Sequence, residues 1–224
     1  SQFKTVPPPI SLPTLRPRPP ARTFEGDRCL LVLPAELCSN IRRLAKEQKN
    51  SYFAVLLAAF QVWLHRLSGA RDLVVGVPFA AQGPMGMDML VGQCANTLPI
   101  RNQLDPAEAF ADVLRNTWSN VLDAQENWNF TYGRLIAKLD LPRDPSRIPL
   151  VSVLFNIDPP MAKVKFRGIQ HRFVTGPRYY FQYDLGFNLV EGEDTICVEC
   201  DYNRNMFDKE VVQFWASGYQ ALLE

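Results

Sequence analysis

The sequence predicts an α/β fold: a two-layer sandwich in which helices pack on one mixed β-sheet. Segments with the 3.6-residue period of amphipathic helices intermix along the chain with short β-branched runs. The last two predicted strands are joined by residues 191–194, a Glu-Gly-Glu-Asp turn typical of a hairpin, so part of the sheet should be antiparallel. With 224 residues, 47% of them hydrophobic, and no internal repeat, a single domain can bury a sizeable core.

The first 22 residues are predicted to form a proline-rich linker or arm, and residues 23–224 the folded body. Proline fixes φ and removes the backbone donor, so this dense run argues against a helix or a central strand and favours an extended polyproline path. The arm is expected to lie along a surface, with a disordered edge of the chain as the alternative. Its prolines and interleaved arginines are Pro7, Pro8, Pro9, Pro13, Arg16, Pro17, Arg18, Pro19, Pro20 and Arg22.

The first half of the body is predicted to contain two strands and two helices. Ser51 is a good N-cap for a helix over 52–67, which is apolar nearly all round and therefore expected to be buried, and Gly69 ends it. Pro78 is expected to stop the strand that follows. The expected order is a strand at 28–33, a helix opened by Pro34, the helix at 52–67 and a strand at 73–77.

The second half begins with a loop rich in glycine and methionine, residues 79–89. Asp105-Pro106 is expected to start a helix that runs to about Gln125. The other expected elements are a turn and strand at 90–101, a short helix at 131–139, a strand at 150–157, a strand or extended arm at 164–174, hairpin strands at 183–190 and 195–202, and a helix at 209–223.

The composition argues against several classes of function. A formal net charge of +1 gives no electrostatic footprint for nucleic acid. No apolar run approaches the ~18 residues needed to span a bilayer, and no secretory signal segment is visible, so a cytoplasmic protein without a membrane partner is expected. The five cysteines are expected to be reduced thiols. Cys197 and Cys200 form a C-x-x-C but should point to opposite faces of a strand, which argues against a shared metal.

Only two histidines occur in the chain, and each is isolated in the sequence. His65 lies near the end of the apolar helix and is expected to be a core or helix-end histidine with its hydrogen bonds satisfied. His171 lies in the basic stretch 167–172, where a solvated position or an interface contact is expected. The chain therefore offers no evident catalytic base.

Several segments in colinear order carry a family resemblance. The main ones are residues 91–101 (VGQCANTLPIR) and 143–150 (RDPSRIPL), supported by residues 56–78 and 201–208. They resemble core motifs of the condensation domains of non-ribosomal peptide synthetases, and the resemblance covers nearly the whole chain. Where the family often has Arg and Phe, this chain has Gln82 and Cys94, a pattern that looks more like members of mixed polyketide–peptide assembly lines.

The resemblance implies a fold similar to that of chloramphenicol acetyltransferase, in which two related lobes form a V with the active site between them. This chain looks like the C-terminal lobe, because the family's active-site motif of two adjacent histidines, three variable residues and Asp-Gly is absent. Residues 78–92 resemble the floor loop, and residues 158–183 lie where the latch is found. These two elements cross to the other lobe in the family.

The resemblance also implies an activity: formation of an amide bond between a carrier-bound acyl or peptidyl thioester and an aminoacyl thioester. The implied partners are the N-terminal lobe and the upstream and downstream carrier proteins. The substrates would arrive on phosphopantetheine arms, so no directly bound cofactor and no metal are expected. The lobe by itself is expected to be inactive.

Two groups of candidate site residues follow, none of them a catalytic base. Asn96, a neutral amide, is expected either to hydrogen-bond a substrate oxygen or amine, or to brace the entry of its strand. The Arg-Asp-Pro-Ser-Arg segment is expected to form a charge-assisted network that ties a loop to the core. The substrate-binding candidates are Gln82, Met85, Gly92, Gln93, Asn96 and Thr97, and the network candidates are Arg101, Arg143, Asp144, Ser146, Arg147 and Asp184.

Two alternative functions stay open at the level of sequence. The chain could be a non-catalytic module that docks carrier proteins or a neighbouring domain. It could also be the lobe of an epimerisation, cyclisation or ester-forming relative, because these relatives share this lobe and their distinguishing motifs lie largely in the other one.

Overall fold

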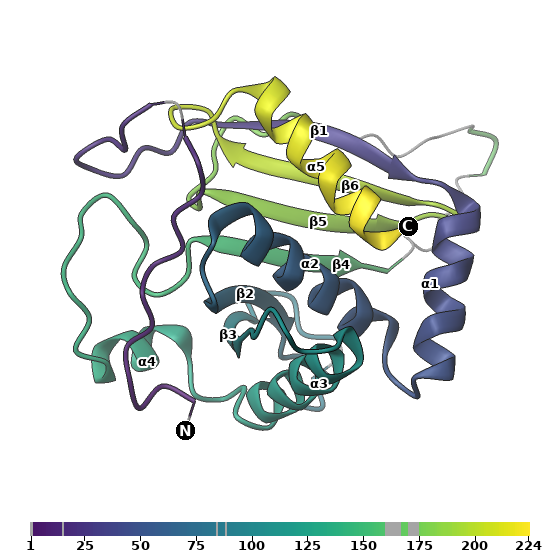
Figure 1. The fold of residues 1–224 in the computed structure, drawn as a ribbon, viewed down its shortest axis with the longest axis horizontal. Helices are drawn as coiled ribbons and strands as arrows, with labels where there is room; N and C mark the ends of the chain where they lie inside the picture. The colour runs from purple at the N-terminus through teal and green to yellow at the C-terminus, as the bar shows by residue number, and fades with distance from the viewer. Residues whose placement is uncertain (1, 15, 84, 88, 160–166, 170–174) are drawn as a thin grey trace.

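The computed structural model describes residues 2–14, 16–83, 85–87, 89–159, 167–169 and 175–224. They form the predicted α/β sandwich, with helices packed on a six-stranded mixed sheet (Figure 1). The elements in chain order are β1 (Gly26–Leu33), α1 (Ala35–Glu47), α2 (Tyr52–Ser68), β2 (Asp72–Ala80), β3 (Ala95–Gln103), α3 (Phe110–Glu126), α4 (Tyr132–Lys138), β4 (Val153–Asp158), β5 (Leu185–Glu191), β6 (Ile196–Asn203) and α5 (Lys209–Leu223).

The order of strands across the sheet is β1-β6-β5-β4-β2-β3. Strand β4 pairs in parallel with both β2 and β5, and the other neighbours are antiparallel. Strands β5 and β6 form the predicted hairpin, with Glu191 opposite Ile196 at its closed end. Strands β1 and β3 are the two edges, so the sheet brings together segments that are far apart in the sequence.

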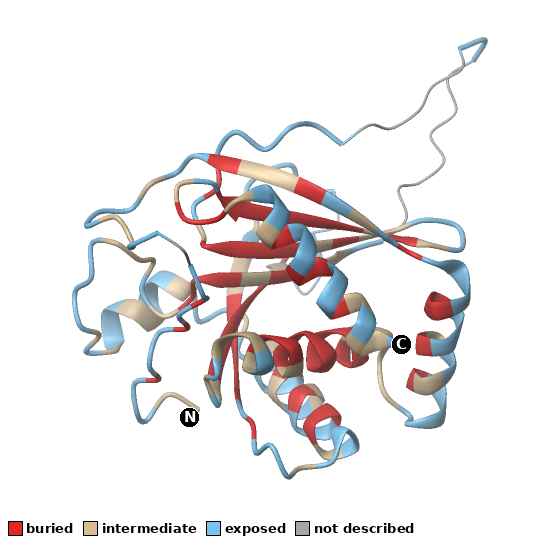
Figure 2. Ribbon diagram, turned by 45° about the horizontal axis from the view of Figure 1, so that its top comes forward, coloured by how far each residue is buried: buried red, intermediate tan, exposed pale blue. Residues whose placement is uncertain are grey.

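The hydrophobic core lies between one face of the sheet and the helices, with Phe60 of α2 near its centre. The Phe60 ring lies 5.0 Å from the rings of both Phe155 on β4 and Phe187 on β5. Ser51 caps α2 by accepting a backbone N–H at 3.0 Å, and Gly69 ends the helix with a φ of 71°, both as predicted. Figure 2 shows how the buried residues concentrate along the sheet and on α2.

The N-terminal arm lies along the body (Figure 1). Ile10 and Leu12 belong to the hydrophobic core, with only 3% and 5% of their surface exposed. The Arg101 guanidinium on β3 donates to the carbonyl oxygens of Gln2 at 2.6 Å and Thr5 at 2.8 Å. Apolar burial and backbone hydrogen bonds therefore both hold the described part of the arm.

The prediction that Pro78 stops a strand was wrong, because β2 continues to Ala80. Strand β4 pairs with β2 only at Val75 and Gly76, whereas pairing with β3 continues to Ala80. Beyond Gly76, β4 no longer forms backbone hydrogen bonds with β2. Pro78, which has no backbone N–H, is therefore tolerated on that side of the strand. Residues 78–80 of the expected floor loop are therefore strand, and the loop proper spans residues 81–94.

The starts of one helix and one strand differ from the prediction by three residues or more. Helix α3 begins at Phe110 rather than at Asp105, because the Asp105 carboxylate accepts the N–H of Ala107 at 3.0 Å and closes a separate turn. Strand β4 begins at Val153 rather than at residue 150. Leu150 has a φ of 68°, which is incompatible with extended strand geometry.

The segment expected to be a strand or extended arm, 164–174, lies mostly outside the described residues, and so does His171. Residues 175–183, the end of the expected latch, run back along the chain's own sheet. The Gly26 N–H donates to the carbonyl of Tyr179 at 3.0 Å, and the Phe181 N–H donates to the carbonyl of Phe24 at 2.9 Å. This described end of the segment is therefore bound to β1 and to the residues that precede it.

Candidate functional site

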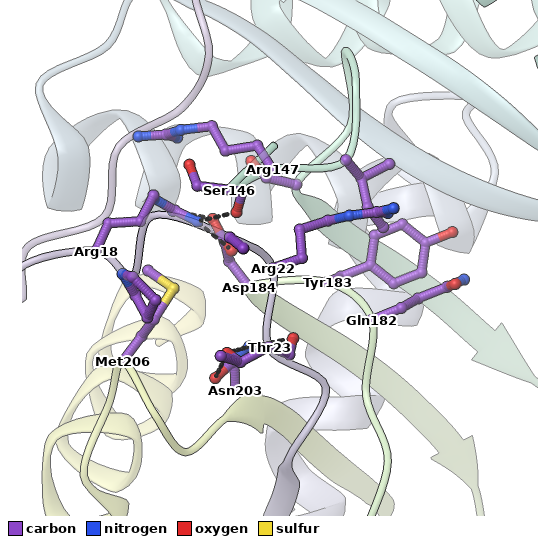
Figure 3. A pocket seen from close by; sticks show the side chains of 14 residues that line it. Arg18, Arg22, Thr23, Ser146, Arg147, Gln182, Tyr183, Asp184, Asn203 and Met206 are labelled. Atoms are coloured by element: carbon purple, nitrogen blue, oxygen red, sulfur yellow. Dashed lines mark hydrogen bonds and ion pairs between the residues drawn. The ribbon is translucent and has the colours of Figure 1, made fainter. Parts of the chain in front are cut away.

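Four of the six network candidates meet where the arm, the 143–149 loop and the start of β5 come together (Figure 3). The guanidinium of Arg18 donates to both carboxylate oxygens of Asp184, at 3.0 and 2.5 Å, and to the carbonyl of Ser146 at 3.2 Å. The Asp184 N–H in turn donates to the carbonyl of Ser152 at 2.9 Å. A residue of the arm thus links the loop to the sheet through a largely buried ion pair.

Within the loop, the side chain of Asp144 accepts from both the N–H and the hydroxyl of Ser146, at 2.8 and 2.6 Å. The hydrogen bond from the Ser146 hydroxyl is the main cause that lowers the pKa of Asp144 below its usual value. Arg147 donates to the carbonyl of Ile10 at 2.8 Å, and its burial, with the nearby charge of Arg18, lowers its pKa. The loop therefore binds the arm at several points.

The pocket in Figure 3 has a cavity volume of about 10 Å³. That is the space of roughly one water molecule, too small for a substrate. Ser146, Arg147 and Asp184 line this pocket, and Asp144 is bound to Ser146 and Arg147 beside it; Arg18, which was not among the candidates, completes the group. The proline-rich composition of the arm gave no signal that one of its arginines would pair with Asp184.

Arg101 and Arg143 do not join this network. Arg101 binds Asp72 of β2 with two hydrogen bonds of 2.8 and 2.6 Å, and the bond to Asp72 is the main cause that raises its pKa. Arg143 is exposed. The six network candidates therefore divide into one cluster, one separate ion pair across β2 and β3, and one surface arginine.

Asn96, at the start of β3, is hydrogen-bonded to the connection between α3 and α4 and to its own neighbour in β3. Its amide donates to the carbonyl of Trp128 at 2.9 Å, and its oxygen accepts the N–H groups of Thr97 at 2.9 Å and Tyr132 at 3.1 Å. This geometry corresponds to bracing, one of the two roles expected for Asn96. The adjacent Thr97 is half-buried.

The other substrate-binding candidates lie in the 81–94 loop. Gln82 is half-buried, and its carbonyl accepts the N–H of Met87 at 2.9 Å, whereas Gly92 and Gln93 are exposed. Apolar side chains also stand out from this loop. The exposed fractions are 37% for Met85, 52% for Met87, 93% for Met89 and 97% for Val91. Several large apolar side chains exposed close together in the sequence suit an interaction site.

The sheet face opposite the helices carries polar side chains that sequence reasoning largely missed. Glu199 of β6, Asn188 of β5 and Asn156 of β4 are partners in register across three neighbouring strands. We call this surface the polar face; it also includes Arg28 of β1 and Asp201 of β6. Its signal in the sequence was a polar residue at alternate positions of strands that are otherwise apolar.

Two arginines neutralise the buried carboxylates on the polar face. Arg28 donates to Asp201 at 2.5 and 2.9 Å and lies 3.0 Å from Glu199, while Arg178 lies 2.9 Å from Asp201. Burial alone would lower the pKa of Arg28, but the hydrogen bond and charge of Asp201 and the charge of Glu199 outweigh it, so the pKa is raised. These charged groups therefore form a closed, paired cluster.

Next to this cluster, the polar face is hollowed into a cleft of about 470 Å³. Its lining combines amides and carboxylates with apolar and aromatic side chains, a composition typical of small-molecule sites. Asn156, Asp158 and Asn188 contribute to the lining from β4 and β5, and Arg178, Tyr180 and Gln182 come from the returning segment 175–183.

His65 has a local structural partner. Its Nδ1 lies 2.8 Å from the carbonyl oxygen of Ala70, just beyond the end of α2, as a helix-end histidine should. Among the described residues, no group of three or more His, Cys, Asp or Glu side chains is arranged to hold a metal ion. Within the same residues, no helix is both long and apolar enough to cross a membrane.

Sequence comparisons identify a protein family and similar proteins for this chain. The family model described as "Condensation domain" matches residues 1–224. Gramicidin S synthase 2 of Brevibacillus brevis is 31% identical over 220 residues, which are 97% of this chain but only 5% of that synthase.

Two solved structures share the fold at 20% sequence identity. Holo-AB3403, a four-domain nonribosomal peptide synthetase bound to AMP and glycine, matches 97% of this chain and 18% of its own chain with a TM-score of 0.86. The complex of the X-domain and OxyB from teicoplanin biosynthesis matches 99% of this chain and 50% of the matched chain, also with a TM-score of 0.86.

Proposed function

Because this chain belongs to the condensation-domain family, we propose that it is the C-terminal lobe of a domain that forms amide bonds in non-ribosomal peptide or mixed polyketide–peptide synthesis. The reaction joins a carrier-bound acyl or peptidyl thioester to the amino group of a carrier-bound aminoacyl thioester. The substrates ride on phosphopantetheine arms, so the lobe itself needs no bound cofactor. The proposed place of action is the cytoplasm.

One observation carries the proposal: the whole chain matches the family, yet it spans half of the matched X-domain chain. If the chain is one lobe of a two-lobed domain, it would cover half of such a chain. The order of the matching sequence segments indicates that this lobe is the C-terminal one. Amide formation also requires a group that removes or orients a proton of the amine. His65 is engaged with Ala70 and no adjacent histidines occur in the sequence, so the N-terminal lobe would supply that group.

On this proposal, the lobe contributes position rather than proton transfer. Holding two reactants in the right geometry can supply a large part of a rate enhancement. Asn96 acts as a positioning residue, because its hydrogen bonds to Trp128 and Tyr132 fix the α3–α4 connection against β3. The Arg18–Asp184 pair fixes the arm and the 143–149 loop in the same way.

The 81–94 loop is the proposed contact with the N-terminal lobe. Its methionines and Val91 expose apolar surface that a partner would bury, and methionine adapts well to the shape of a partner surface. The carrier proteins are the other proposed partners, one for each substrate.

The test is a condensation assay with loaded carrier proteins, in which residues 1–224 are supplied with and without the N-terminal lobe as a second polypeptide. Product formed only when both lobes are present supports the proposal. Product formed by residues 1–224 alone contradicts the inactivity of the single lobe. Absence of product with both lobes, despite an intact pair of histidines in the partner, argues against amide formation.

A docking module is the second candidate function. The solved relative from teicoplanin biosynthesis is an X-domain in complex with OxyB, so this fold occurs in a complex between two proteins. In that case the lobe would bind a neighbouring protein without supporting chemistry. Binding of a carrier protein with equal affinity whether or not it is loaded, together with no product in the assay, would favour this candidate.

A further inference from the structure

The cleft on the polar face presents an unusual set of polar atoms. Its row of Asn156, Asp158 and Asn188 is tied together by hydrogen bonds of 2.9 Å. The Asn156 amide donates to Asp158 and to the side-chain oxygen of Asn188, and the Asn188 amide donates to Asp158 and, at 3.0 Å, to Glu199. Both amide groups therefore have their donors directed at neighbours within the polar face.

The orientations of these amides follow from chemistry. An ionised carboxylate only accepts hydrogen bonds, so the Asn188 nitrogen must face Asp158 and Glu199, and the Asn156 nitrogen must face Asp158. The oxygen of Asn188 then accepts from Asn156. The oxygen of Asn156 receives no hydrogen bond from the described residues, and the Asp158 carboxylate, which can accept about four, receives two. The row thus presents hydrogen-bond acceptors, and no hydrogen-bond donors, to a ligand.

The charge of the cleft points to the same kind of ligand. Asp201 and Glu199 are paired with Arg28, and Asp201 also with Arg178. Asp158, exposed at the end of β4, has no cationic partner among the described residues. A group with several N–H donors and a positive charge complements this surface better than a neutral acceptor or an anion does.

We infer that Asn156 and Asp158 form a binding site for a primary ammonium group, and that its occupant is the α-amino group of the carrier-bound aminoacyl substrate. The identity of the occupant rests on the proposed function, whereas the selectivity for an ammonium group rests on the acceptor row alone. Asp158 accepts two hydrogen bonds from the asparagines, which hold its carboxylate in place, and its remaining lone pairs receive the ammonium N–H groups. Asp158 is thus a positioning residue for the protonated amino group, which becomes the nucleophile only after it has lost a proton to the group that the N-terminal lobe would supply. The cleft beside Asp158 accommodates the amino acid side chain.

The test is a binding experiment on residues 1–224 with three probes. They are alanyl-pantetheine amide, a stable analogue of the aminoacyl thioester; its N-acetyl form, which lacks the ammonium group; and methylamine alone. We expect the alanyl analogue to shift the NMR signals of the side-chain amides of Asn156 and Asn188. The N-acetyl form should bind more weakly by roughly 10- to 100-fold, the value of a lost charge-assisted hydrogen bond. Stronger binding of the alanyl analogue than of methylamine identifies the aminoacyl group, rather than any amine, as the occupant.

Two variants separate a binding role from a structural one. Asp158→Asn should remove the preference for the alanyl over the N-acetyl analogue, a selectivity that a merely structural role would not change. Asp140→Asn, at an exposed aspartate after α4, is the matched control and should leave the preference intact. Equal binding of the two analogues by the unmodified chain, or an unchanged preference in Asp158→Asn, overturns the inference.

The condensation assay distinguishes this inference from the proposed function. If both lobes together form product and Asp158→Asn leaves the KM for the aminoacyl carrier unchanged, the inference fails and the proposed function stands. If no product forms but ammonium selectivity at Asp158 persists, the proposed function fails and the ammonium site stands.

Discussion

Arg18 and Asp184, 166 positions apart in the sequence, form a bidentate ion pair with hydrogen bonds of 3.0 and 2.5 Å. The side chains are only 16% and 9% exposed. Because both charges are largely removed from water, each depends on the other for its stabilisation. The pair joins the N-terminal arm to the residue directly before β5 and, through Arg18, to the 143–149 loop.

Removal of Arg18 should therefore destabilise the fold. Arg18→Gln leaves the Asp184 carboxylate without its charge partner, and we expect the free energy of unfolding to fall by about 2 kcal/mol, less than for a fully buried pair. Urea denaturation followed by circular dichroism measures the change. The control is Arg204→Gln, whose partner Glu25 and own side chain are more than half exposed, and which should cost under about 1 kcal/mol. Equal losses in the two variants would show that burial does not set the strength of the Arg18 pair.

Replacement of Asn96 should loosen the connection between α3 and α4. Asn96→Ala leaves the Trp128 carbonyl and the Tyr132 N–H without a partner, and we expect a loss of roughly 1–3 kcal/mol in stability. Hydrogen exchange at the Tyr132 amide should accelerate. Asn127→Ala, which removes one exposed hydrogen bond to the Asp123 carbonyl, is the control and should have a smaller effect. Unchanged exchange at Tyr132 in Asn96→Ala would contradict the bracing role.

Two glycines make room for Phe181, the residue that anchors the returning segment. A Cβ at Gly26 would lie 2.9 Å from the Phe181 Cβ and 3.0 Å from backbone atoms, which cannot easily move, so Gly26→Ala should cost roughly 1–3 kcal/mol. At Gly186, the new Cβ would meet the far end of the Phe181 ring at 2.7 Å, and the ring can shift, so Gly186→Ala should cost less.

Thermal unfolding of both glycine variants checks this order. Gly133→Ala in α4 is the matched control, because its Cβ would meet nothing within 4 Å and alanine favours a helix by up to about 1 kcal/mol. We expect Gly133→Ala to leave the melting temperature unchanged or raise it. A larger loss in Gly186→Ala than in Gly26→Ala would contradict the argument from backbone contacts.

The loop containing Asp144 should contribute a stability that is lost in acid. The folded-state pKa of Asp144 is lowered, chiefly by the Ser146 hydroxyl. Its contribution is therefore present above the pKa of the unfolded state, about 4, and is lost as the pH falls through the pKa of the folded state. Ser146→Ala should raise the pKa of Asp144 towards its usual value, as an NMR titration of the carboxyl group would show. Ser217→Ala, at an exposed serine on α5, should leave that pKa unchanged.

Sequence and structure agree best where a feature depends on neighbours along the chain. The cap at Ser51, the helix end at Gly69 and the β5–β6 hairpin were all predicted, because caps and turns are decided by a few adjacent residues. The prediction that Cys197 and Cys200 face opposite ways also agrees with the structure, in which Cys200 is buried and Cys197 half-buried. The family, too, was recognisable from short colinear segments.

The wrong prediction at Pro78 has a different cause: it depends on which distant segment lies beside the strand. Pro78 fits inside β2 because β4 pairs with that strand only as far as Gly76, a fact of sheet order and not of local propensity. Cys29 of β1 lies opposite Cys200 of β6, although more than half of the chain separates them. No sequence pattern within either strand predicts that pairing.

The sequence by itself determined the α/β class, the buried helix α2, the hairpin and the family, because hydrophobic period, capping chemistry and short motifs are local properties. Only the tertiary structure decided the Arg18–Asp184 pair, the bracing by Asn96 and the acceptor row of Asn156, Asp158 and Asn188. Hydrogen bonds and ion pairs act over about 3 Å, so they form only after the strand order has brought together residues that the chain keeps far apart.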